Sequence, residues 1–135
     1  MVNKRVMIVD DESDVNLAIK MVLEDSGFQV DSFTDPLLAF ESVKGEPGKY
    51  MLLVLDIRLP NMNGFELYKQ IKKIDDKAKV CFLTGSELYH GGGAYADILN
   101  ILDERYFIQK PIENEQLIAR LNKIILLDSN ANKTT

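Results

Sequence analysis

The sequence predicts an α/β domain with a five-stranded parallel sheet and helices on both of its faces. Short apolar runs alternate with amphipathic helical stretches five times along the chain, as expected when each strand is followed by a crossover helix. Most of these runs are apolar throughout, which is typical of parallel strands covered on both faces. The 135 residues have the size of one compact domain.

The first two strand–helix units begin near the amino terminus. Arg5–Val9 is rich in β-branched residues and predicts a fully covered strand, and the amphipathic helix after it is expected to end near Gly27. Phe28–Phe33 alternates apolar and polar residues and predicts an edge strand. Asp35 and Pro36 have the residue types of a helix cap and a first helical residue, so they predict the start of the second helix.

The third unit contains the most apolar strand of the chain. A turn-rich break at Gly45–Lys49 precedes Met51–Leu55, which we expect to be the central strand. A loop with proline and glycine follows, and a helix is predicted from about Phe65, because apolar residues then recur at helical spacing.

The last two units complete the sheet. Lys79–Thr84 and Tyr106–Gln109 are predicted strands, and Tyr95–Leu102 between them has helical spacing. Glu113–Leu127 predicts a final amphipathic helix, and the polar segment 128–135 is expected to be a disordered tail or the start of a linker.

Composition excludes several classes of function. The net charge of −5 and the pI of about 4.9 argue against direct contact with nucleic acid or an anionic membrane surface. Cys81 is the only cysteine, so the chain has no internal disulfide, and a small core residue is expected there. Residues 1–11 have charges too early and an apolar run too short for the pattern of a signal peptide, and no apolar run in the sequence is long enough to cross a bilayer. We therefore expect a cytoplasmic location.

Polar residues follow the apolar strands at the edge where the carboxyl ends meet. They are Asp10, Asp11 and Glu12 after the first strand, Asp56 after the third, Thr84 after the fourth, and Lys110 and Pro111 after the fifth. Neighbouring carboxylates repel one another unless a cation lies between them. Magnesium, which binds few carboxylates and leaves room for phosphate oxygens, is the ion that suits this edge.

These side chains are the groups needed to handle a phosphoryl group. Phosphoryl transfer depends mainly on positioning and charge neutralisation, and an aspartate such as Asp56 can be the nucleophile. Lys110 would supply a fixed positive charge and Thr84 a hydroxyl donor. Taken singly, the acids could belong to helix capping by Ser13 or Asp14, and the threonine and lysine to ordinary loops. Their joint placement at successive strand ends favours the phosphoryl site.

Four motifs in this order resemble the receiver domain of two-component response regulators. They are VMIVDDE, LLVLDIRLPNMNGFEL, FLTG and FIQKPI, and the resemblance covers about residues 4–127, so that residues 1–127 are the expected domain. The resemblance implies a flavodoxin-like fold with the strand order 2-1-3-4-5.

The resemblance also implies roles for individual residues. Asp56 would be the phosphoacceptor, and Lys110, joined to Pro111 by a cis peptide, would pair with the phosphoryl group. Mg²⁺ would be held by Asp11 directly, by Asp10 through water, and by Asp56 and the backbone carbonyl of Arg58. The switch residues would be Thr84 and Phe107. Arg58 and Ser86 would tune the lifetime of the acyl phosphate.

The implied partner is a phosphohistidine donor, either a sensor histidine kinase or a histidine phosphotransfer protein. A homodimer through the last two helices and the last strand is a further expectation from the resemblance, without direct nucleic-acid contact or membrane insertion. His90, the only histidine, is expected to be a loop residue rather than a donor. The domain would catalyse only its own phosphorylation and dephosphorylation.

Two alternatives compete with this interpretation. A degenerate receiver would bind partners without phosphorylation, but all five residues of the expected site are present. A phosphatase of the haloacid-dehalogenase type needs a second aspartate two residues after the nucleophile, where this chain has Arg58. The segment 86–105 departs most from the family pattern. The three glycines before Tyr95 predict either that residues 87–95 are mobile in a way that depends on phosphorylation, or that they form a tolerated surface insertion with no role in switching.

Overall fold

The computed structural model describes residues 4–85 and 104–126 of the chain. The expected helix at Tyr95–Leu102, the segment with three glycines, Ser86 and the tail at 128–135 lie outside these residues. In the described part, no helix is long and apolar enough to cross a membrane.

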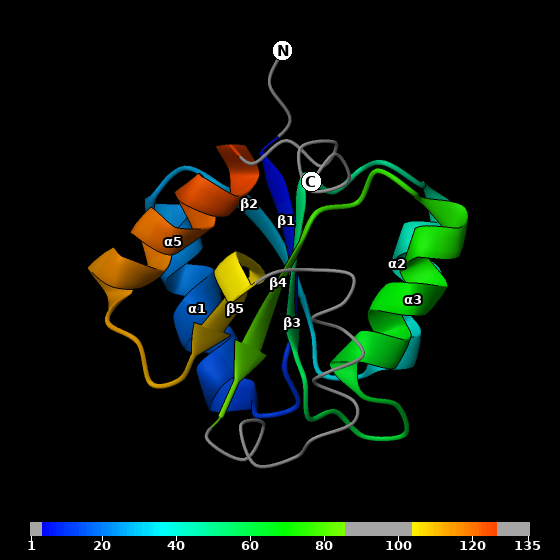
Figure 1. Cartoon of the computed structure of the whole chain (residues 1–135), viewed down its shortest axis with the longest axis horizontal. Coiled ribbons are helices and arrows are strands. Elements are labelled where there is room, and N and C mark those ends of the chain that lie inside the picture. The colour runs from blue at the N-terminus through cyan, green and yellow to red at the C-terminus, as the bar shows by residue number, and fades with distance from the viewer. Residues whose placement is uncertain (1–3, 86–103, 127–135) are drawn as a thin grey trace.

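Five parallel strands form one sheet in the order β2-β1-β3-β4-β5, as the sequence predicts (Figure 1). The strands are β1 (Arg5–Val9), β2 (Gln29–Phe33), β3 (Leu52–Asp56), β4 (Val80–Thr84) and β5 (Phe107–Gln109). The fully apolar third run is the central strand and the alternating second run is an edge strand, because only a central strand has both faces and both edges covered. Tyr106 does not join β5; it ends a short 3₁₀ helix at Glu104–Tyr106.

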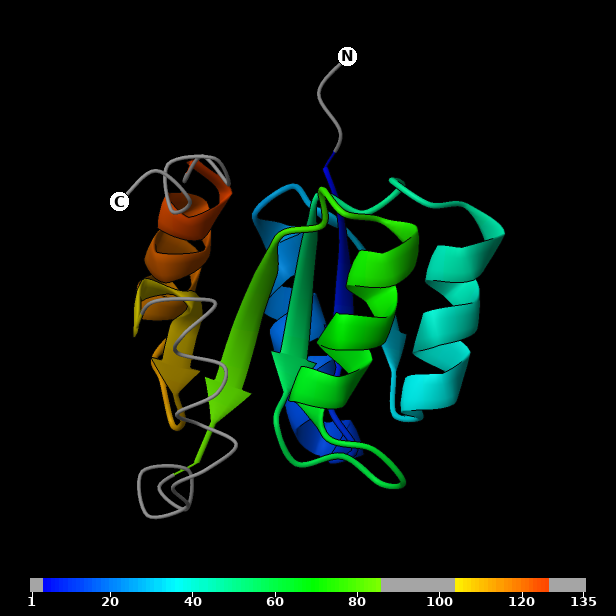
Figure 2. The same ribbon diagram turned by 45° about the vertical axis from the view of Figure 1, so that its right-hand side comes forward.

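The helices cover both faces of the sheet. They are α1 (Ser13–Asp25), α2 (Pro36–Gly45), α3 (Gly64–Ile74) and α5 (Asn114–Leu126). Figures 1 and 2 show α1 and α5 side by side on one face and α2 and α3 side by side on the other. The reversal of strand order lies between β1 and β3, where ligands bind in open α/β sheets.

Local sequence signals set most helix boundaries. The Asp35 carboxylate accepts a hydrogen bond from the backbone of Leu37, which confirms the predicted cap of α2. Asn63 and Glu66 form a reciprocal capping box at the start of α3. Gly27 ends the first unit with a φ of +96°, a value that favours glycine.

The start of α1 differs from the capping that the acids at positions 10–14 allow. Its N-cap residue is Glu12, which makes no side-chain capping bond, and Ser13 and Asp14 lie inside the first turn. The helix therefore begins without a capping role for these side chains. The acids that precede it are available for another purpose.

The core lies on both sides of the sheet and includes an aromatic cluster next to β4. Phe82 contacts Phe65 edge-to-face with 5.0 Å between ring centroids, and it stacks on Phe107 at 5.4 Å. Tyr68 adds a second edge-to-face contact at 5.7 Å. These rings connect α3, β4 and β5 beneath the edge that carries the polar residues.

A polar cluster ties the edge strand β2 to its neighbours. Asp31 accepts hydrogen bonds from Arg5 at 3.1 and 3.2 Å and from the Tyr50 hydroxyl at 2.7 Å, and Tyr50 also contacts the hydroxyl of Ser42 at 2.7 Å. Burial alone would raise the pKa of Asp31, but the bonds from Tyr50 and Arg5 lower it below 3.8. The cluster thus joins β1, β2 and α2 at one point.

Candidate functional site

The structure brings the polar strand-end residues together at the carboxyl edge of the sheet. Asp10 follows β1, Asp56 ends β3, Thr84 ends β4 and Lys110 follows β5. β3 is hydrogen-bonded to both β1 and β4, and β5 to β4, so the register leaves these ends adjacent. Asp10, Asp56 and Thr84 are all buried, unlike most polar residues of a surface loop.

Lys110 brings a positive charge to the buried acids of this site. Its ammonium lies 3.3 Å from Oδ2 of Asp56, 3.5 Å from Oδ2 of Asp10 and 4.0 Å from Oε1 of Glu12. Burial alone would lower the pKa of Lys110, but the carboxylates of Asp56 and Asp10 raise it. The lysine is therefore held as a cation between acids. Its peptide bond with Pro111 is cis.

Asp56 is a carboxylate in an unfavourable environment for negative charge. Only 4% of the residue is exposed. Burial, followed by repulsion from Asp10, raises the pKa of Asp56 to about 6, although the charge of Lys110 opposes this shift. The ionised carboxylate is thus a group that a further positive charge would stabilise.

A cluster of oxygen donors surrounds this carboxylate. Carboxylate oxygens of Asp10, Asp11 and Asp56 lie within 4.8 Å of one another, and Asp11 is exposed while the other two are buried. A depression of about 380 Å³ opens above them. Its lining comprises Asp11, Glu12, Asp56, Arg58, Gly85 and Lys110. The donor set consists of hard oxygen ligands, which suit a magnesium ion.

The loop between β3 and α3 approaches the backbone of Asp56 closely. The amide of Arg58 donates to Oδ1 of Asp56 at 3.3 Å, and the amide of Gly64 donates to the carbonyl of Ile57 at 2.9 Å. A Cβ atom on Gly64 would overlap the carbonyl oxygen of Asp56 and lie 3.1 Å from its carbonyl carbon. Asn61 turns this loop with a φ of +70°. Glycine at position 64 is therefore required for the loop to fold back onto the strand end.

The expected switch residues Thr84 and Phe107 are both buried. The hydroxyl of Thr84 donates to the carbonyl of Gly85 at 2.9 Å, and the Thr84 carbonyl accepts from the Lys110 amide at 2.7 Å. Phe107 stacks on Phe82 in the aromatic cluster. The structure thus links the two residues through β4 and β5, while their role in switching stays a prediction.

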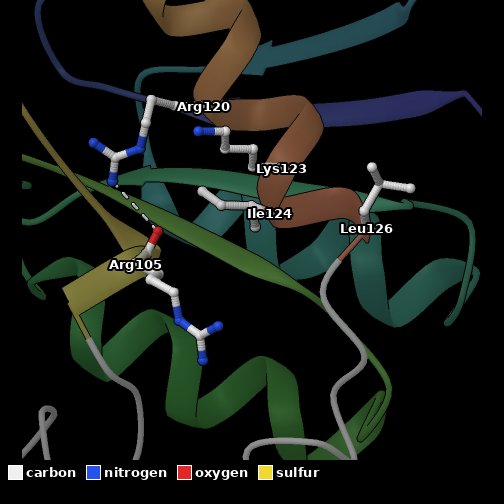
Figure 3. A pocket seen from close by; sticks show the side chains of 5 residues that line it. All are labelled: Arg105, Arg120, Lys123, Ile124 and Leu126. Carbon is white, nitrogen blue, oxygen red and sulfur yellow. Dashed lines mark hydrogen bonds between the residues drawn. The ribbon is translucent and has the colours of Figure 1, made fainter.

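A second pocket, of about 460 Å³, lies on α5 away from the acids (Figure 3). It is lined by Arg105, Arg120, Lys123, Ile124 and Leu126. The guanidinium of Arg120 donates to the carbonyl of Phe107 at 2.6 Å and to that of Arg105 at 3.4 Å, the bond drawn in the figure. This arginine therefore ties α5 to the start of β5.

Comparison with known proteins defines the class that the fold and the acidic edge indicate. Residues 6–122 match the family "Response regulator receiver domain", and the chain belongs to that family. Receiver domains of two-component systems are signalling domains whose output depends on phosphorylation, rather than conventional enzymes, and they bind Mg²⁺ at an acidic pocket. They interact with histidine kinases or phosphotransfer proteins.

Individual relatives support this assignment. The response regulator receiver protein CpdR of Brucella abortus is 34% identical over 61% of this chain and 67% of its own length. The chemotaxis protein CheY of Thermotoga maritima is 30% identical over 90% of this chain and 97% of its own. The receiver domain of HemR from Leptospira biflexa, a solved structure, has a TM-score of 0.76 at 29% identity, with 92% and 95% coverage. The chain spans about half the length of the transcriptional regulators that it also matches.

Two residues contribute to the site in ways that the sequence pattern did not reveal. Gly64 allows the close approach to Asp56, and Asn16 contacts the backbone of Asp10. Glu12, expected at this edge from the sequence, extends the acidic environment of Lys110. Gly64 lies within the motif LLVLDIRLPNMNGFEL, but the overlap that requires glycine there involves backbone atoms that only the folded chain brings together. For Asn16, the sequence shows only a polar residue within a helical stretch, which does not indicate a contact with the strand ends.

Proposed function

We propose that this domain accepts a phosphoryl group from a phosphohistidine onto Asp56. An oxygen of the Asp56 carboxylate attacks phosphorus, the P–N bond to the donor imidazole breaks, and the imidazole leaves with the electron pair and takes up a proton. The product is an acyl phosphate on Asp56. The observation that carries this proposal is a buried, charge-stressed carboxylate lying 3.3 Å from a fixed ammonium beside two further acids.

The residues that would hold magnesium are Asp11 and Asp56, with Asp10 acting through water and Arg58 through its backbone carbonyl. The donor set fits this ion, because the oxygens of the three acids converge within 4.8 Å and one of the acids is exposed to solvent. When bound, the ion would neutralise charge on the phosphoryl oxygens. The ion would then be a second positive charge near the carboxylates of Asp10 and Asp56, beside the ammonium of Lys110.

Lys110 and Thr84 would report the modification to the rest of the fold. The Lys110 ammonium already contacts Asp56 Oδ2, so a dianionic phosphoryl group there would compete for it and pull on the end of β5. We propose that Thr84 turns its hydroxyl from Gly85 to the phosphoryl group, and that the ring of Phe107 repacks in response. Arg58 and Ser86 would influence hydrolysis of the acyl phosphate, and Ser86 lies outside the described residues.

The donor would be a sensor histidine kinase or a histidine phosphotransfer protein in the cytoplasm. We further propose a homodimer through α5, β5 and the segment before them as one output of the modified state. Direct contact with nucleic acid by this domain is disfavoured by its net charge of −5.

Intact mass after incubation with Mg²⁺ and acetyl phosphate tests the central proposal. We expect the mass of one phosphoryl group to be added to wild type and none to be added to Asp56→Asn, which has nearly the same shape but no nucleophilic carboxylate. Asp25→Asn, which changes an exposed carboxylate at the end of α1, is the matched control and should be modified like wild type. Equal modification of Asp56→Asn would refute Asp56 as the acceptor, and no modification of wild type would favour a phosphorylation-independent binding module.

Thermal melting tests the magnesium site. Because an ion that binds only the folded state stabilises it by linkage, millimolar Mg²⁺ should raise the Tm of wild type. Asp11→Ala should abolish this shift. An equal shift in both proteins would contradict the proposed ligands.

The response to beryllofluoride, a phosphoryl mimic, tests Lys110. Amide chemical shifts in β5 and α5 should change on addition to wild type and change much less in Lys110→Ala. A full response in the variant would show that coupling does not pass through this lysine.

A further inference from the structure

Asn16 is a buried polar residue of α1 that contacts the ends of two strands. It is 3% exposed. Its side-chain amide nitrogen donates to the carbonyl oxygen of Asp10 at 3.0 Å and to that of Phe33 at 2.7 Å. The Phe33 carbonyl also accepts from the backbone amide of Asp10 at 3.1 Å. One side chain thus joins the ends of β1 and β2 to the first turns of α1.

Both contacts use the nitrogen of the amide, and this determines its orientation. Two carbonyl oxygens face the nitrogen, so the side-chain oxygen must point away from them. Within the described residues that oxygen, Oδ1, is buried and has no hydrogen-bond partner. An unpaired buried acceptor lowers stability. Stability alone therefore does not explain an asparagine here, and such exceptions are expected at functional positions.

The bond to Asp10 acts on the position of Asp11. The Asp10 carbonyl and the Asp11 amide belong to one planar peptide unit, so holding the oxygen fixes the direction in which Asp11 leaves the sheet. The carboxylate Oδ1 of Asp10 accepts from the amide of Glu12 at 2.9 Å and fixes the other end of the same turn. Asp11 itself is exposed, and its carboxylate nevertheless lies within 4.8 Å of those of Asp10 and Asp56.

We propose that Asn16 is a positioning residue for the phosphorylation site, which holds the Asp10–Asp11 peptide so that the Asp11 carboxylate meets those of Asp10 and Asp56 around a magnesium ion. The inference rests on the proposed function, because it assumes that these acids bind the ion. Asn16 touches neither the ion nor the phosphoryl group. It acts through the backbone of the residue next to a ligand, as groups that orient metal ligands do.

Calorimetric titration of Mg²⁺ into Asn16→Leu, in the whole chain, tests the proposal. Leucine has a similar volume and no hydrogen-bond donor, so the Asp10 carbonyl loses its bond from the side chain at position 16 while the helix keeps its packing. We expect the Kd for Mg²⁺ to rise about tenfold or more, as for other groups that orient ligands. The urea midpoint in EDTA should fall less than in a variant that loses core packing, because removal of the unpaired oxygen partly offsets the two lost bonds. Asn16→Ala is the second variant if leucine is not accommodated.

Leu23→Ala is the matched control, since Leu23 is fully buried on the same helix two turns further along. It should lower the urea midpoint more than Asn16→Leu while leaving the Kd within about twofold of wild type. An unchanged Kd in the Asn16 variants would overturn the positioning role, as would an equal loss of affinity in Leu23→Ala. If wild type itself takes up no Mg²⁺, the failure belongs to the proposed magnesium site.

Discussion

Gly64→Ala tests the close approach between the β3–α3 loop and the strand end that carries Asp56. The added Cβ would overlap the Asp56 carbonyl oxygen and lie 3.1 Å from the carbonyl carbon and 3.2 Å from Cα of Ile57. All three atoms belong to the backbone of a buried strand end, so a side-chain rotation cannot relieve the overlap. The loop or the strand end must move by about 1 Å to restore normal contacts.

The expected cost follows from this overlap. Overpacking of a well-packed region costs about 1–3 kcal/mol. Alanine recovers less than about 1 kcal/mol through chain entropy and helix propensity. Because the overlap is with backbone atoms, the cost should lie at the upper end of that range, so we expect a net loss of about 2 kcal/mol in the free energy of unfolding, or a fall in Tm of roughly 8 °C for a domain of this size. The rate of phosphorylation should fall as well, because the displaced atoms hold Asp56.

Gly45→Ala is the control. Gly45 lies at the end of α2, and a Cβ there would meet nothing within 4 Å. Its substitution by alanine should leave the Tm unchanged or raise it slightly, with a gain of up to about 0.5 kcal/mol in the free energy of unfolding. Urea unfolding and thermal melting followed by circular dichroism measure both variants. A Gly64→Ala protein as stable and as readily phosphorylated as Gly45→Ala would refute the reasoning.

Three further predictions concern charge and packing. Tyr50→Phe removes the hydroxyl that donates to Asp31 and should lower the free energy of unfolding by about 1 kcal/mol at pH 7. This bond helps to lower the folded-state pKa of Asp31 below 3.8, so the difference in urea midpoint between variant and wild type should shrink as the pH falls below that value. A difference that stays constant with pH would contradict the prediction. Asp56 has a folded-state pKa of about 6, above its ordinary 3.8, so stability should fall as pH rises from 4 to 6. Asp56→Asn in EDTA should therefore be more stable than wild type by about 2 kcal/mol at pH 7 and by much less at pH 4, whereas a pH-independent gain would show that the carboxylate is not under charge stress. Phe82→Leu removes the central ring of the aromatic cluster and should cost about 2 kcal/mol, seen as a lower urea midpoint with an unchanged slope.

Most of the fold could be predicted because its signals are local. Apolar runs identify strands, helical spacing identifies helices, and the alternating pattern of β2 marks an edge. The same patterns locate the strand ends, so they predict that Asp56 and Lys110 lie at one edge of the sheet. The capping of α1 was ambiguous, because the acids at positions 10–14 suit either a helix start or an ion site. The structure shows that neither Ser13 nor Asp14 caps α1, because the N-cap residue is Glu12 and it makes no side-chain capping bond.

The sequence by itself determined the order of elements, the edge at which the acids gather and the family, since these follow from patterns within short stretches. Tertiary structure alone decided which backbone atoms Gly64 and Asn16 contact, and how far burial and Asp10 raise the pKa of Asp56. The physical reason is distance along the chain. Overlap, hydrogen bonding and charge repulsion depend on separations of a few ångströms between residues on different elements, and these separations exist only after the sheet and its helices have packed.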